Sequence, residues 1–245
     1  RRHATDPQRR LQRRLPVGAV DHHAAGLGLG MRKRLVIGQH RLSGDAGLAQ
    51  LAEAGPPPDD AHLAALLAAV AGQAVSHVLV THTHRDHSPL ARPFAQAVGA
   101  PVLAARPPAR VVHASGRLDE DEDDAFAPDV ILGGGEVLQG DGWTLEAMAT
   151  PGHASNHMAF VLREENALFS GDHVMGWSTS VVVPPDGDMA DYMRSLDKLY
   201  AREDRVYYPA HGPAVDNPRQ LVRGMIGHRR MRERQILGLL EKTSQ

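Results

Sequence analysis

The stretch VTHTHRDHSPLA, residues 80–91, concentrates side chains that bind metals into six positions. The apolar residues 78–80 directly before it predict a short buried strand. The cluster therefore begins at the carboxyl end of a strand, where α/β proteins commonly build their sites. So many imidazole and carboxylate groups this close together would repel one another or titrate awkwardly unless something positive held them together. The four residues concerned are His82, His84, Asp86 and His87.

The spacing of these residues predicts how they could bind a cation. His82 and His84 are two positions apart on an extended segment and project to the same side, so both could contact one ion. Asp86 and His87 follow on a turn and could face a second ion. Neutral imidazoles with a carboxylate suit zinc, with manganese or iron as alternatives. A bound dication would also keep the imidazoles unprotonated.

The His-x-His-x-Asp-His pattern resembles that of the metallo-β-lactamase superfamily, and three later motifs extend the resemblance over residues 55–240. TPGHASNH, residues 150–157, supplies a histidine after a glycine, His153. LFSGDHV, residues 168–174, supplies an aspartate after a strand, Asp172. YYPAHGP, residues 207–213, supplies a last histidine, His211.

The resemblance implies an α/β fold, an αββα sandwich with a dinuclear metal site between its two sheets. The first ion would be held by His82, His84 and His153. The second would be held by Asp86, His87 and His211, and Asp172 would bridge the two. A hydroxide shared by the ions would be the nucleophile, because coordination lowers the pKa of water from 15.7 to about 7. Asp86 would be the catalytic residue that orients the hydroxide or removes its proton.

Several neighbours of these motifs have simpler interpretations. We expect His157 and His173 to support the site rather than to bind a metal. Trp177 follows Asp172 and could either line a pocket or pack inside the protein. The six acidic residues 119–124 predict a solvated loop, with a cation site as the alternative.

The branch of the superfamily is indicated by the absence of cysteine. Many zinc β-lactamases use a cysteine at the second metal, where this chain has Asp172. The aspartate resembles the glyoxalase II, ribonuclease Z and β-lactamase-like hydrolase branches, the last of which includes a single-strand endoribonuclease. In that group a winged-helix module commonly follows. We expect none here, because the sequence stops at residue 245, and this argues against RNA as the partner.

An arginine-rich helix is predicted near the end of the chain, beginning at Asn217 and Pro218. Its arginines could contact phosphates, but a solvated helix surface is the commoner explanation. No aromatic stacking platform accompanies them, which weakens the case for single-strand binding. A small-molecule substrate is therefore preferred over RNA. The arginines are Arg219, Arg223, Arg229, Arg230, Arg232 and Arg234.

The first part of the chain differs from the rest. Residues 1–54 are rich in arginine, and we expect a disordered or non-family leader, with a transit peptide as the alternative. Residues 55–245 would form the hydrolase domain. The superfamily usually opens with two or three strands, but residues 35–38 predict one strand at most. We therefore hypothesise an incomplete or poorly packed first sheet, and a loosely held site of low activity.

Composition excludes some classes of protein. The 245 residues carry a formal net charge of −2, which gives no overall attraction to nucleic acid or membranes. Without cysteine there are no disulfides and no thiolate metal ligands. No apolar run approaches the roughly 18 residues of a membrane span, and no signal peptide is visible. We expect a cytoplasmic protein, and the sequence does not indicate its oligomeric state.

The sequence thus predicts a dinuclear metal-dependent hydrolase, with two zinc ions, acting on an ester, a thioester or a phosphodiester. One alternative is a non-catalytic or degenerate metal-binding member of the fold. Another is a di-iron oxidoreductase of the same fold. The bound metal would separate hydrolase from oxidoreductase, because zinc favours hydrolysis and iron favours redox chemistry. Substitution of Asp86 or Asp172 would separate the degenerate protein from the active one.

Overall fold

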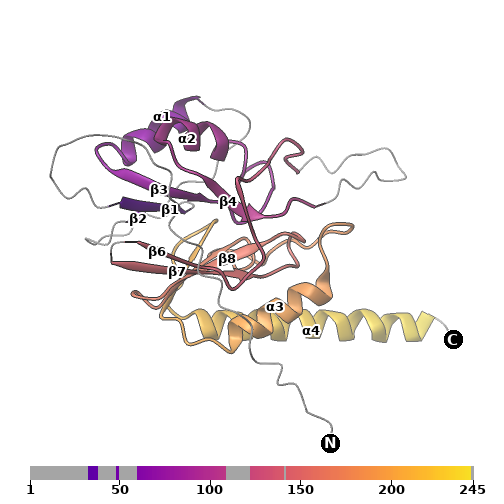
Figure 1. Ribbon diagram of the computed structural model, residues 1–245. Helices are drawn as coiled ribbons and strands as arrows, with labels where there is room; N and C mark the ends of the chain where they lie inside the picture. The colour runs from indigo at the N-terminus through magenta and orange to yellow at the C-terminus, as the bar shows by residue number, and fades with distance from the viewer. Residues whose placement is uncertain (1–32, 38–47, 50–59, 109–121, 141, 244–245) are drawn as a thin grey trace, which may run out of the picture.

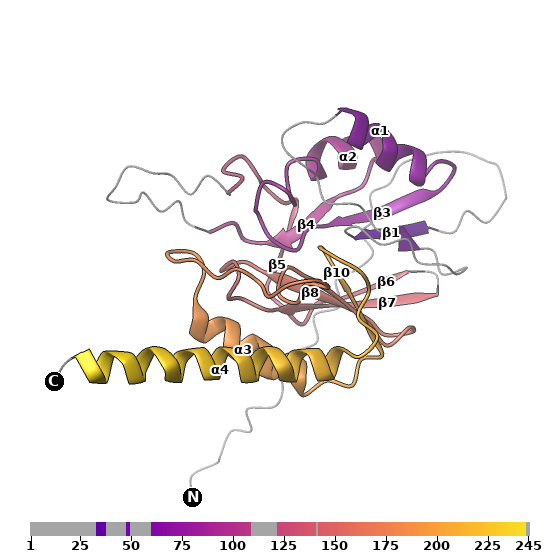
Figure 2. The same ribbon diagram turned by 180° about the vertical axis from the view of Figure 1, so that it is seen from behind.

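The computed structural model describes residues 33–37, 48–49, 60–108, 122–140 and 142–243. Two five-stranded sheets lie face to face, and helices cover the outer face of each (Figure 1). The same four layers are seen from behind in Figure 2. The predicted αββα sandwich is confirmed.

The first sheet is parallel throughout and has the strand order β2-β1-β3-β4-β5. Parallel sheets need cover on both faces. Here the helices α1 and α2 cover one face and the second sheet covers the other (Figure 1). The strands are β1 (Lys33–Ile37), β2 (Leu48–Ala49), β3 (Ala74–Leu79), β4 (Val102–Ala105) and β5 (Val130–Leu132).

Residues 35–37 lie in a single strand, β1, in line with the prediction for this stretch, and a second strand, β2, also precedes the first helix. β1 pairs with β3 over its whole length, and β2 adds two residues at the sheet edge. A strand as short as β2 carries too little apolar periodicity to be seen in a sequence. Both strands come from residues 1–54, so part of that segment belongs to the sheet. The start of the hydrolase domain stays a prediction.

Two helices cover the first sheet. They are α1 (Asp60–Ala69) and α2 (Ala91–Val98). Phe94 of α2 is fully buried in a cluster with Val78 and Val102 of the sheet. α2 ends at Gly99, whose left-handed conformation lets its backbone N–H donate to the carbonyl of Ala95.

The second sheet has the order β10-β9-β8-β7-β6 and is antiparallel except where β9 meets β10. Its outer face is covered by α3 (Met189–Tyr200) and α4 (Pro218–Thr243). Asp188 caps α3 by accepting a hydrogen bond from the backbone of Asp191. The strands are β6 (Val137–Gly140), β7 (Trp143–Ala149), β8 (Met158–Leu162), β9 (Ala167–Gly171) and β10 (Val206–Pro209).

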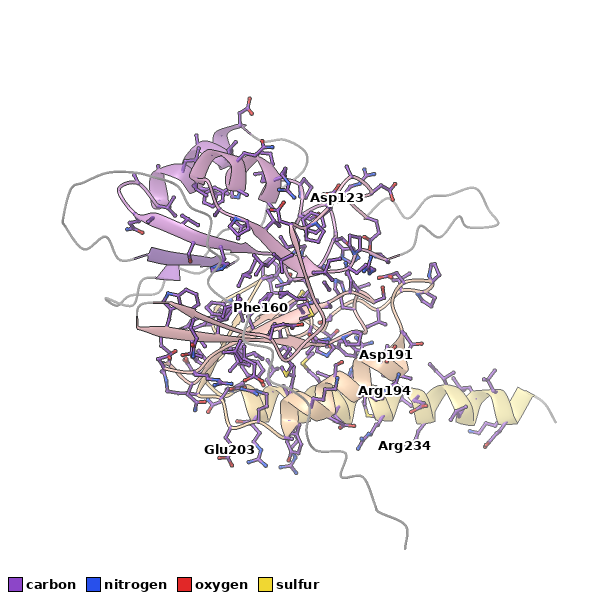
Figure 3. The ribbon with its side chains drawn as sticks, in the orientation of Figure 1. Asp123, Phe160, Asp191, Arg194, Glu203 and Arg234 are labelled. Atoms are coloured by element: carbon purple, nitrogen blue, oxygen red, sulfur yellow. The ribbon has the colours of Figure 1, made fainter. Side chains whose placement is uncertain are left out.

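The main core lies between the sheets. Leu79 and Leu103 from the first sheet pack with Leu145, Phe160 and Phe169 from the second. Phe160 is fully buried and is labelled at the centre of Figure 3. Burying a side chain of this size contributes roughly 1.5–3 kcal/mol. The core therefore fixes the two layers, and with them the loops that end at their edge.

α4 runs beyond the body of the protein, and Figure 3 labels Arg234 on the projecting part. Arginines nearer its start contact protein groups. Arg219 lies over the ring of Tyr200, Arg229 lies over the ring of Tyr192, and Arg230 pairs with Asp197. These contacts support a structural use of several of the arginines. In the described part of the chain, no helix combines the length and hydropathy that crossing a membrane would require.

Candidate metal centre

The loop after β3 carries the first four predicted residues. A turn follows His84, whose carbonyl accepts hydrogen bonds from the backbone N–H groups of His87 and Ser88. This turn brings His87 back beside His82, with ring centroids 3.9 Å apart. The side chains of a six-residue stretch are thereby directed to one place.

Three other loops bring the remaining residues to the same edge. His153 lies between β7 and β8, Asp172 directly follows β9, and His211 follows β10. β9 and β10 are parallel, so their carboxyl ends meet at one edge of the sheet. A backbone hydrogen bond from Met158 to the carbonyl of Thr81 joins this edge to the first layer. All seven predicted residues therefore converge where the two sheets meet.

The first group consists of three histidine nitrogens, two from the loop after β3 and one from the loop between β7 and β8. His84 Nδ1 lies 2.9 Å from His82 Nε2 and 3.1 Å from His153 Nε2. Two nitrogen ligands of a tetrahedral zinc ion, each 2.0–2.1 Å from the metal, are about 3.3 Å apart. The three histidines are therefore spaced closely enough to share one ion.

The second group is formed by Asp86, His87 and His211. Asp86 places one carboxylate oxygen 3.4 Å from His87 Nε2 and the other 3.3 Å from His211 Nε2. These separations also match those of ligands around one ion. Within each group the three possible ligand atoms lie within 4.8 Å of one another.

Asp172 lies between the two groups. Its Oδ2 is 3.7 Å from His153 Nε2, 3.6 Å from His87 Nε2 and 3.5 Å from His211 Nε2. Its Oδ1 is buried and has no hydrogen-bond partner among the described residues. A buried carboxylate oxygen without a partner is costly unless something positive binds it. The donor set therefore fits two cations, with Asp172 between them.

The electrostatics leave these groups in the protonation states that metal ligands need. Burial lowers the pKa of His82 well below its usual value, and the nearby His87 and His84 lower it further. Burial also lowers the pKa of His153, an effect that the charge of Asp172 opposes. Burial would raise the pKa of Asp172, but the hydrogen bond and charge of His87 reverse the shift. Neutral imidazoles and an ionised carboxylate are the forms that bind a cation.

His157 supports the centre, as the sequence predicted. Its Nε2 accepts a hydrogen bond from the backbone N–H of Asp172, and its Nδ1 lies 2.8 Å from the hydroxyl of Thr150. Gly171 makes this approach possible. Its φ is +52°, and a Cβ there would lie 2.5 Å from His157 Nε2. The glycine before Asp172 therefore lets His157 accept a hydrogen bond from the backbone of that aspartate.

Glu122 is a residue of the centre that the sequence reading missed. Its Oε1 lies 3.5 Å from His84 Nε2, and its Oε2 accepts a hydrogen bond from Thr83. An isolated bridge also pairs Glu122 with His84 along the backbone. A carboxylate behind a metal-binding histidine orients its ring. The prediction of a solvated loop for residues 119–124 is wrong for Glu122, whose side chain is 13% exposed, and residues 119–121 lie outside the described part of the chain.

His173 and Trp177 complete the surroundings. His173 is fully buried, packs against the ring of Tyr192, and lies outside both groups. Neither of its ring nitrogens has a hydrogen-bond partner in the described chain. Trp177 is 73% exposed, which excludes the packing role left open by the sequence, and its ring is parallel to that of His211 at 6.4 Å.

A sequence profile described as the metallo-beta-lactamase superfamily matches residues 44–211. The chain belongs to this superfamily. The match covers every residue of both groups and the strand β2, and it confirms the resemblance seen in the sequence. The assignment of each side chain as a ligand stays a prediction.

Several fungal proteins are similar to this chain in sequence. The lactamase-like protein aptB of Emericella nidulans is 38% identical over 169 residues, which cover 69% of this chain and 48% of that protein. The atrochrysone carboxyl ACP thioesterase AgnL7 of Paecilomyces divaricatus is 38% identical over 168 residues, 69% of this chain and 48% of that protein. The chain thus matches about half the length of these relatives.

Solved structures share the fold. A metallo-beta-lactamase family protein from Thermus thermophilus, TTHA1429, superposes with a TM-score of 0.59 and 26% identity, covering 76% of this chain and 71% of that one. ETHE1 from Myxococcus xanthus superposes with a TM-score of 0.51 and 19% identity, covering 69% of each chain. At that identity the second likeness shows the fold alone.

Proposed function

We propose that this chain is a dinuclear metal-dependent hydrolase that cleaves thioesters. The position of Asp172 Oδ2, 3.5–3.7 Å from histidines of both groups, carries this proposal. Among ester, thioester and phosphodiester substrates, the thioester is favoured by relatives. Two of them are named atrochrysone carboxyl ACP thioesterases, and a third is named thioesterase pkgB.

We assign His82, His84 and His153 to one cation and Asp86, His87 and His211 to the other, with Asp172 between them. Zinc is the metal that this donor set suits best. When bound, the two cations would polarise the substrate carbonyl and make a water acidic enough to attack at neutral pH. Hydrolysis then forms a carbon–oxygen bond, breaks the carbon–sulfur bond, and leaves a carboxylic acid and a thiol that takes up a proton.

Asp86 has the exposure that contact with a water or a substrate requires, since 49% of its side chain is accessible. Burial would raise the pKa of Asp86, but hydrogen bonds from His211 and His87 lower it far below its usual value. A carboxylate with so low a pKa stays ionised and holds a proton weakly. We therefore assign Asp86 to orienting the attacking water by accepting its hydrogen bond.

The proposal is tested with purified protein, its metal content, and a panel of substrates. The panel contains an S-acyl-N-acetylcysteamine thioester, p-nitrophenyl acetate and bis-p-nitrophenyl phosphate. We expect about two zinc ions per chain and the highest kcat/KM on the thioester. A chelator should abolish this activity, and zinc should restore it. A fully zinc-loaded protein that hydrolyses no thioester would contradict the proposal, and two iron ions would favour the oxidoreductase.

A further inference from the structure

The loop between β9 and α3 presents exposed apolar side chains beside the metal centre. Trp177 is 73% exposed, Val181 61% and Val183 58%. We call these three residues the apolar wall. Exposed apolar groups that gather beside a polar site commonly mark the place where a ligand binds.

The apolar wall is attached to both metal groups. The carbonyl of Val181 lies 2.6 Å from Nδ1 of His153, which belongs to the first group. At the other end, the ring of Trp177 is parallel to that of His211, which belongs to the second. The backbone N–H of Gly176 donates to the carbonyl of His211 at 2.8 Å. Two residues of the wall therefore lie next to histidines of different groups, Val181 beside His153 and Trp177 beside His211.

The loop that carries the apolar wall is held by hydrogen bonds and packing. Its exposed side chains therefore do not belong to a freely moving loop. Ser180 is buried, and its hydroxyl donates to the carbonyls of Asp172 and His173. Arg229 of α4 donates to the carbonyl of Ser180. Val182 faces inward and packs against the core under α3 and α4. Residues thus alternate, with 180 and 182 directed inward and 181 and 183 outward, as on a strand.

The far end of the loop is also held. The side chain of Asp186 accepts a hydrogen bond from the backbone of Ser155, next to the His153 segment. The backbone N–H of Gly187 donates to the carbonyl of Val183 at 2.8 Å. A binding surface that is held in place before the ligand arrives loses little entropy on binding.

We propose that the apolar wall binds the acyl group of the thioester substrate, and that this group is apolar and larger than acetyl. The inference rests on the proposed function, because it places the scissile carbonyl at the metal centre. An acyl chain leaving that carbonyl toward the wall would contact the Trp177 ring and the two valines. These contacts bury apolar surface on both partners, which is the favourable term.

The test compares two thioesters that lack any carrier protein, acetyl- and octanoyl-S-N-acetylcysteamine. In the wild-type protein we expect a higher kcat/KM for the octanoyl compound. Trp177→Ala should lower the ratio of octanoyl to acetyl kcat/KM about tenfold, since it removes a large apolar contact, and Trp177→Phe should retain part of it. Leu239→Ala is the matched control, because Leu239 is 64% exposed on the far part of α4.

A binding measurement separates this inference from the proposed function. The chain has two tryptophans, and Trp143 is 2% exposed, so Trp177 dominates any change in emission on ligand binding. The ketone analogue of the octanoyl thioester, with a methylene in place of sulfur, should shift the emission to shorter wavelength. Trp177→Phe should abolish the shift, and Leu239→Ala should keep it.

Each outcome decides one of the two statements. A shift without hydrolysis of any thioester would keep the wall as a binding surface and reject the thioesterase. Hydrolysis with an unchanged octanoyl-to-acetyl ratio in Trp177→Ala, and no shift, would reject the wall. An effect of Trp177→Ala only on substrates attached to an acyl carrier protein would also overturn it, because the wall would then contact the carrier.

Discussion

The two sheets contribute to the metal centre in different ways. The first sheet supplies His82, His84, Asp86 and His87 from one loop after β3. The second supplies His153, Asp172 and His211 from three loops, which follow β7, β9 and β10. One contribution is set by a local turn, and the other depends on the pairing of strands far apart in the sequence.

Because of this difference, neither sheet can complete a metal-binding group without the other. The loop after β3 holds residues of both groups, but it completes neither, because His153 belongs to one and His211 to the other. Asp172 is the carboxylate whose Oδ2 lies 3.5–3.7 Å from histidines of both groups. The contribution of the second sheet should therefore decide whether the two cations bind together, and substitutions in the two halves should have different effects.

The largest effect is expected for Asp172→Ala. Loss of a residue behind a metal ligand already costs 10–100-fold in affinity or activity, so loss of the ligand between both groups should exceed about 100-fold. We expect thioester hydrolysis to fall by more than that, and both metals to be lost together. Metal content per chain, measured with the hydrolysis rate, checks this. Asp191→Ala changes an aspartate on α3 whose side chain is 39% exposed, and it serves as the control (Figure 3).

If Asp172→Ala retained both metals, the role of the second sheet in joining the two groups would be rejected. It would also be rejected if His84→Ala, which touches the first group alone, removed both cations equally. In either case the two groups would not be joined through the aspartate.

A smaller effect is expected for Glu122→Gln. The neutral amide can no longer provide a negative charge beside His84 Nε2, so the ring should be held less firmly. We expect zinc affinity at the first group to fall about 10–100-fold, measured by competition with a chelator. Asp124→Asn, an exposed position in the same acidic segment, should leave the affinity near that of the wild type. Equal affinities for Glu122→Gln and the wild type would exclude the positioning role.

The next effect concerns pH and the metal-free protein. Burial lowers the pKa of His157 well below its usual value of 6.5. Between its folded pKa and 6.5 the unfolded chain binds the proton and the folded chain does not. The free energy of unfolding of the metal-free protein is therefore highest above pH 6.5. It falls as the pH drops below 6.5, by up to about 1.4 kcal/mol per pH unit for this histidine. His82 in the first layer follows the same direction.

Urea unfolding at pH 7, 6 and 5 measures this slope. His157→Gln should reduce it by about one proton, and His82→Gln should do the same from the other layer. A slope unchanged by both substitutions would mean that neither histidine is buried in its neutral form.

The smallest effects are expected at the surface of each layer. Arg92 pairs with Asp129 beside the first sheet, and Arg163 pairs with Glu146 on the second. All four side chains are about a third to a half exposed, so either pair contributes no more than about 1 kcal/mol. Arg92→Ala and Arg163→Ala should each lower the free energy of unfolding by that amount or less. A clearly larger loss at one of them would show that this layer depends on its surface charges.

Much of the fold and of the site could be predicted from the sequence. The seven residues lie in four short motifs whose order along the chain resembles that of the metallo-β-lactamase superfamily, and this resemblance implies the fold. The apolar run 78–80 marks the strand before His82, and glycines at positions 171 and 212 stand beside Asp172 and His211.

Other features depend on contacts that no local pattern encodes. Glu122 meets His84 from a distant part of the sequence, and one acid in an acidic run is indistinguishable from its neighbours. β2 is too short to have a periodicity. Trp177 is a large apolar residue of the kind usually found in a core. It is exposed here because Ser180 and Val182 of the same loop are the residues that pack inward.

The convergence of loops from both sheets has a mechanical consequence for a protein that has no cysteine. Each proposed cation would tie a segment of one layer to a segment of the other, in the manner of a covalent cross-link. The two sheets would then be held together by metal coordination at one edge and by apolar side chains in the core between them. A chelator that removes the cations would break these links. The loops at this edge should then open locally more often than the core between the sheets.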